Sequence, residues 1–169
     1  MKTLLLFRHG KSDWHADYSH DHQRPLARRG RRAARAMGRW LTHIGPMPDQ
    51  IISSMALRTR QTCHFARKAG DWAAPVEYEG GLYGADPMDL LDCIRAAPDS
   101  SRVLMLIGHQ PTWSETIAGF TGRSVMRFPT AAMARVDLPV ESWLDVEFGL
   151  GTLVWLQIPK ELPAAYGGR

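Results

Sequence analysis

Short apolar segments, each ended by a glycine or by small polar residues, recur along this chain and predict buried strands. The two clearest cover residues 3–7 and 103–107, and a third surrounds residues 51–52 within the stretch 49–54. A weaker apolar run covers residues 76–78. Apolar runs of roughly four to eight residues, bounded by turn signals, are typical of strands that are buried on both faces of a sheet.

Between these strands, apolar side chains recur at the spacing of an amphipathic helix. The spacing predicts helices over residues 25–44, 57–68, 87–94 and 111–122, with Pro25, Pro87 and Pro111 at three of their starts. Two later segments, at residues 132–138 and 152–158, predict a final pair of strands. Because strand and helix alternate over most of the length, we expect an α/β fold with three α/β/α layers. Its central sheet should be mostly parallel, and the last strand pair should add antiparallel neighbours.

The composition is that of an ordinary globular protein, since 44% of the 169 residues are hydrophobic and 22% are charged. This length predicts a single domain over residues 1–169, with a loosely held tail at residues 159–169. No run approaches the roughly 18 apolar residues of a membrane span, and the amino terminus shows no signal-peptide pattern. We therefore expect a cytoplasmic protein without a membrane partner.

The formal net charge is +4, and much of it comes from the arginines between Arg24 and Arg39. A nucleic-acid site would interleave such residues with stacking aromatics, and this stretch lacks that pattern. A solvated helix face is the first interpretation, and docking of an acidic or phosphorylated partner is the second. Cys63, Cys93 and the seven histidines show no metal-ligand spacing, so we expect free thiols and no metal.

Polar clusters follow three of the predicted strands. They are Arg8-His9-Gly10, residues 53–62, and Gly108-His109-Gln110-Pro111. Ligands of open α/β sheets bind beyond the carboxyl ends of the strands, so these clusters should converge on one crevice. A histidine there can act as a nucleophile, while arginine offers a rigid fork of donors that matches phosphate oxygens.

These residues resemble the histidine phosphatase superfamily, the group with the phosphoglycerate mutase fold. The resemblance rests on Arg8-His9-Gly10, on the pattern Ser-Ser-x-x-x-Arg-x-x-Gln-Thr that ends at Thr62, and on Gly108-His109-x-Pro111. Within the superfamily the chain is similar to the SixA-type phosphohistidine phosphatases. Four further segments carry this likeness: Lys11-Ser12-Asp13-Trp14, Arg24-Pro25-Leu26, Leu82-Tyr83-Gly84-Ala85 and Phe128-Pro129-Thr130-Ala131-Ala132. The resemblance as a whole extends from about residue 3 to residue 158.

The resemblance implies a metal-independent phosphatase that needs no cofactor. Neutral His9 would attack phosphorus and form a phosphohistidine intermediate, with its other ring nitrogen held by a backbone carbonyl. Arg8 and Arg58 would bind the non-bridging oxygens, and His109 would donate a further hydrogen bond to the phosphoryl group. Two interpretations of Arg24 stay open. It is either a phosphate-binding residue at the pocket edge or one more exposed arginine of the basic stretch.

Other residues near these motifs have simpler explanations. Trp14 and Tyr83 could line the pocket mouth or cap a core, and Ser54 and Thr62 could orient Arg58 or cap its helix. Residues 11–24 are polar and irregular, and they carry Asp13, Asp17 and Asp21. The remaining histidines are expected on the surface or in packing: His15, His20, His22, His43 and His64.

The chain departs from the family pattern at the residue that protonates the leaving group. Most members carry a glutamate for this step, whereas the segment before Leu82 is Glu79-Gly80-Gly81, which leaves Glu79 and Asp86 as the available acids. A nitrogen leaving group depends less on such an acid than an alkyl oxygen does. A mutase is disfavoured, because the stretch between Arg58 and His109 lacks the long insertion of those enzymes.

We therefore expect a phosphatase whose favoured substrate is phosphohistidine on a protein. A phosphatase of small phosphate esters or anhydrides is one alternative, so the partner is a phosphorylated protein or a small phosphorylated substrate. A module that binds phosphate without turnover is another alternative, which the intact His9 and the paired arginines disfavour. The physiological substrate, the proton donor and the oligomeric state stay open.

Overall fold

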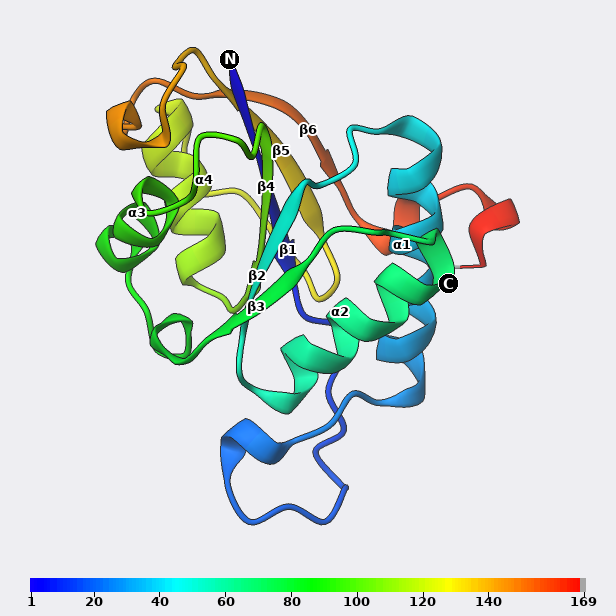
Figure 1. Ribbon diagram of the computed structural model, residues 1–169. Coiled ribbons are helices and arrows are strands. Elements are labelled where there is room, and N and C mark those ends of the chain that lie inside the picture. The colour runs from blue at the N-terminus through cyan, green and yellow to red at the C-terminus, as the bar shows by residue number, and fades with distance from the viewer. Residues whose placement is uncertain (168–169) are drawn as a thin grey trace.

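The computed structural model describes residues 1–167, whose strands form one six-stranded sheet in the order β3-β2-β4-β1-β5-β6 (Figure 1). The strands are β1 (Lys2–Arg8), β2 (Gln50–Ser54), β3 (Val76–Glu79), β4 (Val103–Gly108), β5 (Met133–Leu138) and β6 (Thr152–Gln157). Strands β3, β2, β4 and β1 are parallel, while β5 pairs antiparallel with both β1 and β6. The expected mostly parallel sheet with a late antiparallel pair is confirmed.

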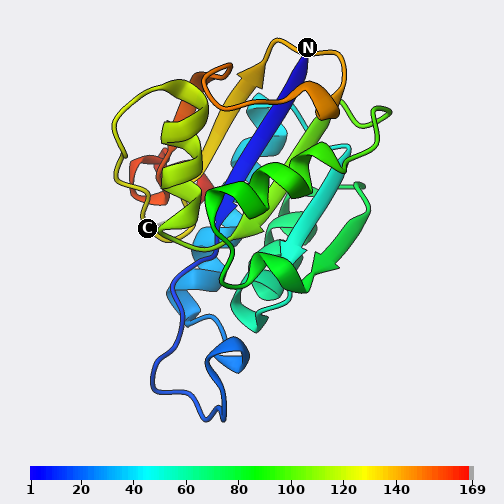
Figure 2. The ribbon, with the colours of Figure 1, turned by 90° about the vertical axis from the view of Figure 1, so that its left-hand side faces the viewer.

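Helices cover both faces of this sheet, as Figures 1 and 2 show. On one face lie α1 (Arg28–Ile44) and α2 (Leu57–Gly70), and on the other α3 (Pro87–Arg95) and α4 (Thr112–Thr121). Side chains of β1 alternate between the two cores. Leu5 and Phe7 join the core under α1, while Leu4 and Leu6 join the core under α4. The predicted α/β/α layers are therefore confirmed.

Short 3₁₀ turns occupy several of the connections in the described chain. They are η1 (Asp21–Gln23), η2 (Gly80–Leu82), η3 (Trp143–Asp145), η4 (Pro159–Glu161) and η5 (Ala164–Tyr166). Within residues 1–167, no helix is both long and apolar enough to cross a membrane.

The register of the two central strands brings their polar ends to the same level. β1 and β4 pair from Thr3 with Val103 to Arg8 with Gly108. The backbone N–H of the next residue, His9, donates to the Gly108 carbonyl at 3.1 Å. The residues that follow each strand therefore leave the sheet side by side, which is how a parallel sheet gathers a site at its carboxyl edge.

The first helix begins later than its apolar spacing predicted. α1 starts at Arg28 rather than at Pro25, because the residues before it are tied to the segment after β1. Ser12 forms an isolated bridge with Leu26, and the N–H of Ala27 donates to the carbonyl of Lys11 at 2.8 Å. These bonds fix the entry of α1 beside the carboxyl end of β1.

The carboxyl-terminal residues do not form a loose tail. Leu162 is buried in the core between the sheet and α1. The hydroxyl of Tyr166 lies 2.7 Å from Nδ1 of His43, a residue of α1. The tail prediction is therefore wrong for residues 159–167, because apolar side chains in this segment complete the core. Residues 168–169 lie outside the described residues.

Candidate active site

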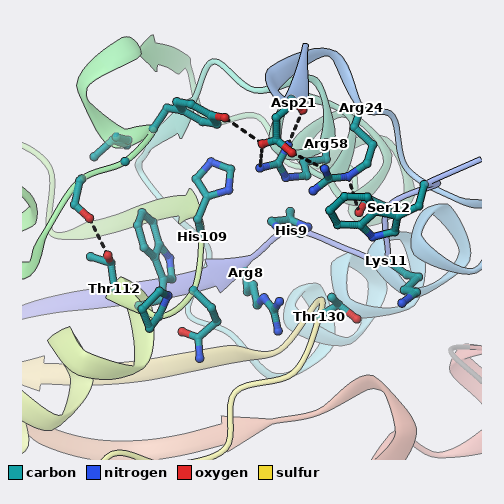
Figure 3. A pocket seen from close by; sticks show the side chains of 18 residues that line it. Arg8, His9, Lys11, Ser12, Asp21, Arg24, Arg58, His109, Thr112 and Thr130 are labelled. Atoms are coloured by element: carbon teal, nitrogen blue, oxygen red, sulfur yellow. Dashed lines mark hydrogen bonds and ion pairs between the residues drawn. The ribbon is translucent and has the colours of Figure 1, made fainter. Parts of the chain in front are cut away.

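The predicted site residues meet in one cavity of about 500 Å³ beyond the carboxyl ends of the central strands (Figure 3). Arg8 ends β1 and His9 follows it, His109 follows β4, and Arg58 lies in the first turn of α2. All four line this cavity, and so does Arg24 from the segment before α1. The convergence that the strand ends predicted is present in the fold.

His9 is held in one tautomer by its own loop. Its Nδ1 lies 2.7 Å from the carbonyl oxygen of Gly10, and because a carbonyl only accepts, Nδ1 carries the proton. Burial lowers the pKa of His9, the bond to Gly10 raises it, and His109 and the charges of Arg58 and Arg8 lower it, which together bring the pKa to about 3. His9 is therefore neutral near pH 7, and its Nε2 has a free lone pair.

Gly10 anchors this histidine because no side chain fits at its position. A Cβ on Gly10 would lie 2.7 Å from the carbonyl oxygen of Gly30, in the first turns of α1. The N–H of Gly10 donates to Oγ1 of Thr62 at 3.0 Å, and that hydroxyl donates to the Arg58 carbonyl at 2.7 Å. Thr62 thus ties the His9 loop to α2 and does not orient the Arg58 side chain.

Arg58 is a buried cation and Arg8 a partly buried one, and the donors of both are only partly used. Arg8 donates from Nη1 to the carbonyl of Phe128 at 3.0 Å. Arg58 donates from Nη1 and Nη2 to Asp21 at 2.9 and 3.0 Å. The Nε atoms of both arginines are buried without a partner, and they are two of three such nitrogens in the described chain. An unpaired buried N–H is costly, so these donors favour an oxyanion in the cavity.

Asp21 is a site residue that the sequence did not distinguish from Asp13 and Asp17. Its carboxylate contacts Arg24 and Arg58 and accepts a hydrogen bond from the Tyr83 hydroxyl at 2.8 Å. Burial raises the pKa of Asp21, but the Tyr83 bond and the two arginines outweigh it and bring the pKa to about 2. Asp21 is therefore an ionised residue that faces the arginines of the cavity.

Arg24 is not one more exposed arginine of the basic stretch, since its side chain is buried in the cavity wall; its binding of phosphate stays a prediction. Its Nε donates to Oγ of Ser12 at 3.0 Å, and its guanidinium stacks 3.6 Å from the ring centre of Trp14. Trp14 and Tyr83 both line the cavity and stay well exposed, so they are mouth residues rather than core caps.

His109 faces His9 across the cavity. The centres of the two imidazole rings lie 5.4 Å apart, and the ring of Tyr83 meets His109 edge-on at 5.6 Å. Nε2 of His109 lies 2.8 Å from Oγ of Ser54, so Ser54 positions this histidine and not Arg58. Burial and the charge of Arg58 lower the pKa of His109 more than the Asp21 carboxylate raises it, and the pKa is about 4. His109 is therefore also neutral near pH 7.

Comparison with known proteins agrees with this geometry. The family model described as histidine phosphatase superfamily (branch 1) matches residues 4–93. An uncharacterized protein of Mycobacterium tuberculosis is 36% identical over 163 residues, which cover 90% of this chain and 99% of that protein. This chain belongs to the histidine phosphatase superfamily.

Two solved structures assigned as the phosphohistidine phosphatase SixA are similar to this member of the superfamily. The one from Nakamurella multipartitia is 27% identical, with a TM-score of 0.82, and covers 93% of this chain and 95% of its own. The one from Agrobacterium tumefaciens is 26% identical, with a TM-score of 0.80, and the match covers 94% of this chain and 98% of that chain. The resemblance to the SixA-type branch is therefore confirmed.

The two acids expected near the site of this superfamily member lie elsewhere. Glu79 accepts a hydrogen bond from the N–H of Gly81 at 3.1 Å, and Asp86 caps α3 in a reciprocal capping box with Asp89. Neither lines the cavity. Both carboxylates therefore serve local turns, and neither is among the residues of the cavity that could protonate a leaving group there.

None of the residues expected to have no catalytic role lines the cavity. His15, His20, His22, His43 and His64 are exposed. Cys63 and Cys93 are free, and burial raises the pKa of both thiols to about 11. Across residues 1–167, no three histidine, cysteine, aspartate or glutamate side chains are grouped so that they could hold a metal ion.

Proposed function

We propose that this protein is a phosphatase that hydrolyses phosphohistidine carried on a protein, with His9 as its nucleophile. The observation that carries the proposal is the state of His9. It is neutral, its Nδ1–H is fixed on the Gly10 carbonyl, and it lies in one cavity with two arginines that have unused Nε donors. Such an arrangement suits attack on a phosphoryl group whose charge the arginines stabilise.

The reaction has two steps: the phosphoryl group is transferred first from the substrate to His9 and then from His9 to water. Nε2 of His9 forms a bond to phosphorus, the bond from phosphorus to the substrate imidazole breaks, and its electron pair stays on the departing nitrogen. That nitrogen takes a proton from water in the open cavity. A water molecule then attacks phosphorus, the bond to Nε2 breaks, and inorganic phosphate leaves. Arg8 and Arg58 bind the equatorial oxygens in both steps.

The acid–base properties of the cavity favour nitrogen as the leaving atom. The carboxylate that lines the cavity belongs to Asp21, and its pKa of about 2 keeps it ionised near pH 7. An ionised carboxylate cannot protonate an alkyl oxygen as that oxygen departs. An imidazole nitrogen is basic enough to be protonated by water, so phosphohistidine needs no acid from the protein. The likeness to structures assigned as SixA supports the same substrate.

Rapid-quench trapping tests this function. Wild type and His9→Ala are mixed with a ³²P-phosphohistidine protein or with an aryl phosphate, both in the presence of a chelator. Wild type should form an acid-labile, base-stable phosphoryl-enzyme and turn over the phosphohistidine protein faster. His9→Ala should form none. Turnover retained in His9→Ala, or activity abolished by the chelator, would overturn the mechanism. Preference for the aryl phosphate would instead assign the enzyme to small esters or anhydrides.

A further inference from the structure

A second hollow, of about 520 Å³, adjoins the catalytic cavity and differs from it in chemistry. It is lined by Lys11, Arg29, Ala33, Arg127, Pro129, Thr130, Ile158, Pro159 and Lys160, and is called here the basic groove. Lys11 and Thr130 belong to the linings of both the groove and the catalytic cavity. Figure 3 shows these two residues together at one edge of the catalytic cavity. The groove therefore opens directly beside the catalytic cavity without sharing its catalytic residues.

The cations of the basic groove come from four separate parts of the chain. Lys11 follows β1, Arg29 lies in the first turn of α1, Arg127 lies between α4 and β5, and Lys160 lies in η4. All four are exposed, and none makes a side-chain hydrogen bond or ion pair with another described residue. The part of the lining that the structure describes includes no aspartate or glutamate. Like charges gathered without counter-charges repel one another, so the fold gains nothing from this arrangement.

The lining also indicates which kind of anion fits. Apolar residues lie among the cations, with Ala33, Pro129 and Ile158 beside them. None of the described lining residues is an aromatic on which a base could stack, so the groove differs from a single-strand nucleic-acid site. A peptide with acidic side chains and a few apolar ones complements both parts of the lining.

We propose that the basic groove binds an acidic segment of the protein substrate, next to its phosphorylated residue. This inference rests on the proposed function for the identity of the phosphorylated group. Lys11 would bind the acidic residue nearest to the phosphorylated residue. The other three cations of the groove would bind acidic residues further along the peptide: Arg29, Arg127 and Lys160. The groove would thus select among phosphorylated proteins by their flanking sequence, while the catalytic cavity binds the phosphoryl group itself.

Two phosphohistidine peptides of equal length test the groove, one with aspartates and glutamates on one side of the phosphorylated residue and one with asparagines and glutamines. Wild type should have a kcat/KM on the order of tenfold higher for the acidic peptide, and this preference should fall with added salt. The double variant Arg29→Gln/Arg127→Gln should lose the preference and keep its rate on an aryl phosphate. The matched control Arg102→Gln/Arg123→Gln removes two exposed arginines outside the groove and should keep the preference.

Equal kcat/KM for the two peptides in wild type, or equal losses in the two double variants, would overturn the proposal. If neither peptide is hydrolysed while the aryl phosphate is, the phosphohistidine assignment fails, and the groove is then tested by binding alone. Fluorescence anisotropy with the unphosphorylated acidic peptide should give a weaker affinity for the groove variant than for the control. A single-stranded oligonucleotide that binds more tightly than this peptide would assign the groove to nucleic acid instead.

Discussion

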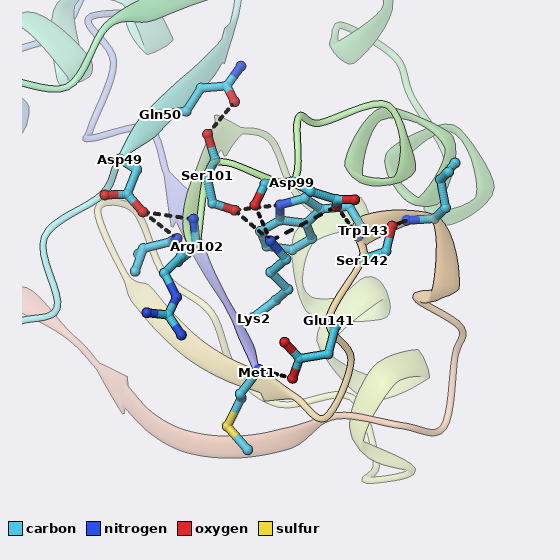
Figure 4. Close-up of polar contacts among 12 residues, drawn as sticks. Met1, Lys2, Asp49, Gln50, Asp99, Ser101, Arg102, Glu141, Ser142 and Trp143 are labelled. Carbon is cyan, nitrogen blue, oxygen red and sulfur yellow. Dashed lines mark hydrogen bonds and ion pairs between the residues drawn. The ribbon is translucent and has the colours of Figure 1, made fainter.

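β1 carries a cation at each end, Lys2 buried and Arg8 partly buried, and the two ends differ in how their donors are used. At the amino end, Lys2 is 4% exposed, and its Nζ donates to the carbonyls of Asp99 and Ser101 at 2.6 and 3.2 Å (Figure 4). It also lies 4.0 Å from the Asp99 carboxylate and 5.4 Å from the centre of the Trp143 ring. At the carboxyl end, Arg8 has one described partner, and its Nε has none.

The contrast separates a structural cation from a functional one. An ammonium has three donors, and the surroundings of Lys2 supply acceptors for them, so its charge is balanced within the fold. Polar residues near Lys2 also have hydrogen-bond partners within the fold, since the Asp49 carboxylate accepts from the backbone N–H groups of Arg102 and Val103. Arg8 and Arg58 instead keep N–H groups whose partner is not part of the fold. Unused donors on cations that line one cavity are thus a sign of an anion site.

The largest effect is expected from Arg8→Met. The substitution removes a donor and a charge that act on the phosphoryl group, so kcat should fall about 10²–10³-fold, as for other preorganised donors. The free energy of unfolding should change by no more than about 1 kcal/mol, since one hydrogen bond is lost and a partly buried charge is removed with it. Steady-state kinetics and urea unfolding measure the two quantities. A stable variant with wild-type kcat would contradict the assignment of Arg8 to the reaction.

Replacement by methionine at the amino end of β1, Lys2→Met, should instead lower the stability and leave kcat unchanged. The carbonyls of Asp99 and Ser101 lose a donor, which should cost about 1–3 kcal/mol of unfolding free energy. The kcat should stay at the wild-type value, because the catalytic cavity lies at the far end of the strand. Urea unfolding at pH 7.5, with kinetics on the same samples, gives both numbers. Loss of kcat without loss of stability would remove the distinction between the two ends.

The two histidines of the cavity make stability dependent on pH. An unfolded histidine has a pKa near 6.5, whereas those of His9 and His109 in the fold are about 3 and about 4. Between pH 6.5 and about 4 the unfolded chain binds more protons than the folded chain does. The contribution of these histidines to the free energy of unfolding is therefore complete above this window and falls as the pH is lowered through it. The slope is at most about 1.4 kcal/mol per pH unit for each histidine.

Urea unfolding at several pH values between 7 and 4.5 measures this slope. His9→Asn should have a shallower slope than wild type, because one linked group is removed. Lys2→Met should keep the wild-type slope, which separates linkage at the cavity from general destabilisation. An unchanged slope in His9→Asn would show that the fold does not depress the pKa of His9.

The smallest effect concerns Asp21, whose carboxylate lies against the same arginines that the phosphoryl group needs. Asp21→Asn removes a negative charge from the cavity, so inorganic phosphate should bind several-fold more tightly. Tyr83→Phe is the matched control, because it removes the hydrogen bond to Asp21 and leaves the charge in place. Isothermal titration with phosphate compares the two variants. Weaker phosphate binding in Asp21→Asn would show that Asp21 instead holds Arg58 in its binding orientation.

The sequence by itself determined the order of elements and the four residues at the strand ends. Apolar runs and helical spacing are local signals, and they placed most boundaries close to those observed. Arg8, His9 and His109 were identifiable because they stand at the carboxyl ends of strands, and Arg58 because it matches the family motif in the first turn of the next helix. The parallel topology then required them to meet.

Only the tertiary structure decided which loop residues belong to the site. Asp21 and Arg24 line the cavity, while Glu79 and Asp86 cap local turns, and nothing in the composition of these loops distinguishes the two pairs. The burial of Leu162 and Lys2 could not be predicted from the sequence either, because each side chain is buried by residues that are far away in the chain. Local propensity determines helices and strands, whereas the charge state and orientation of a loop side chain depend on the distant groups packed against it.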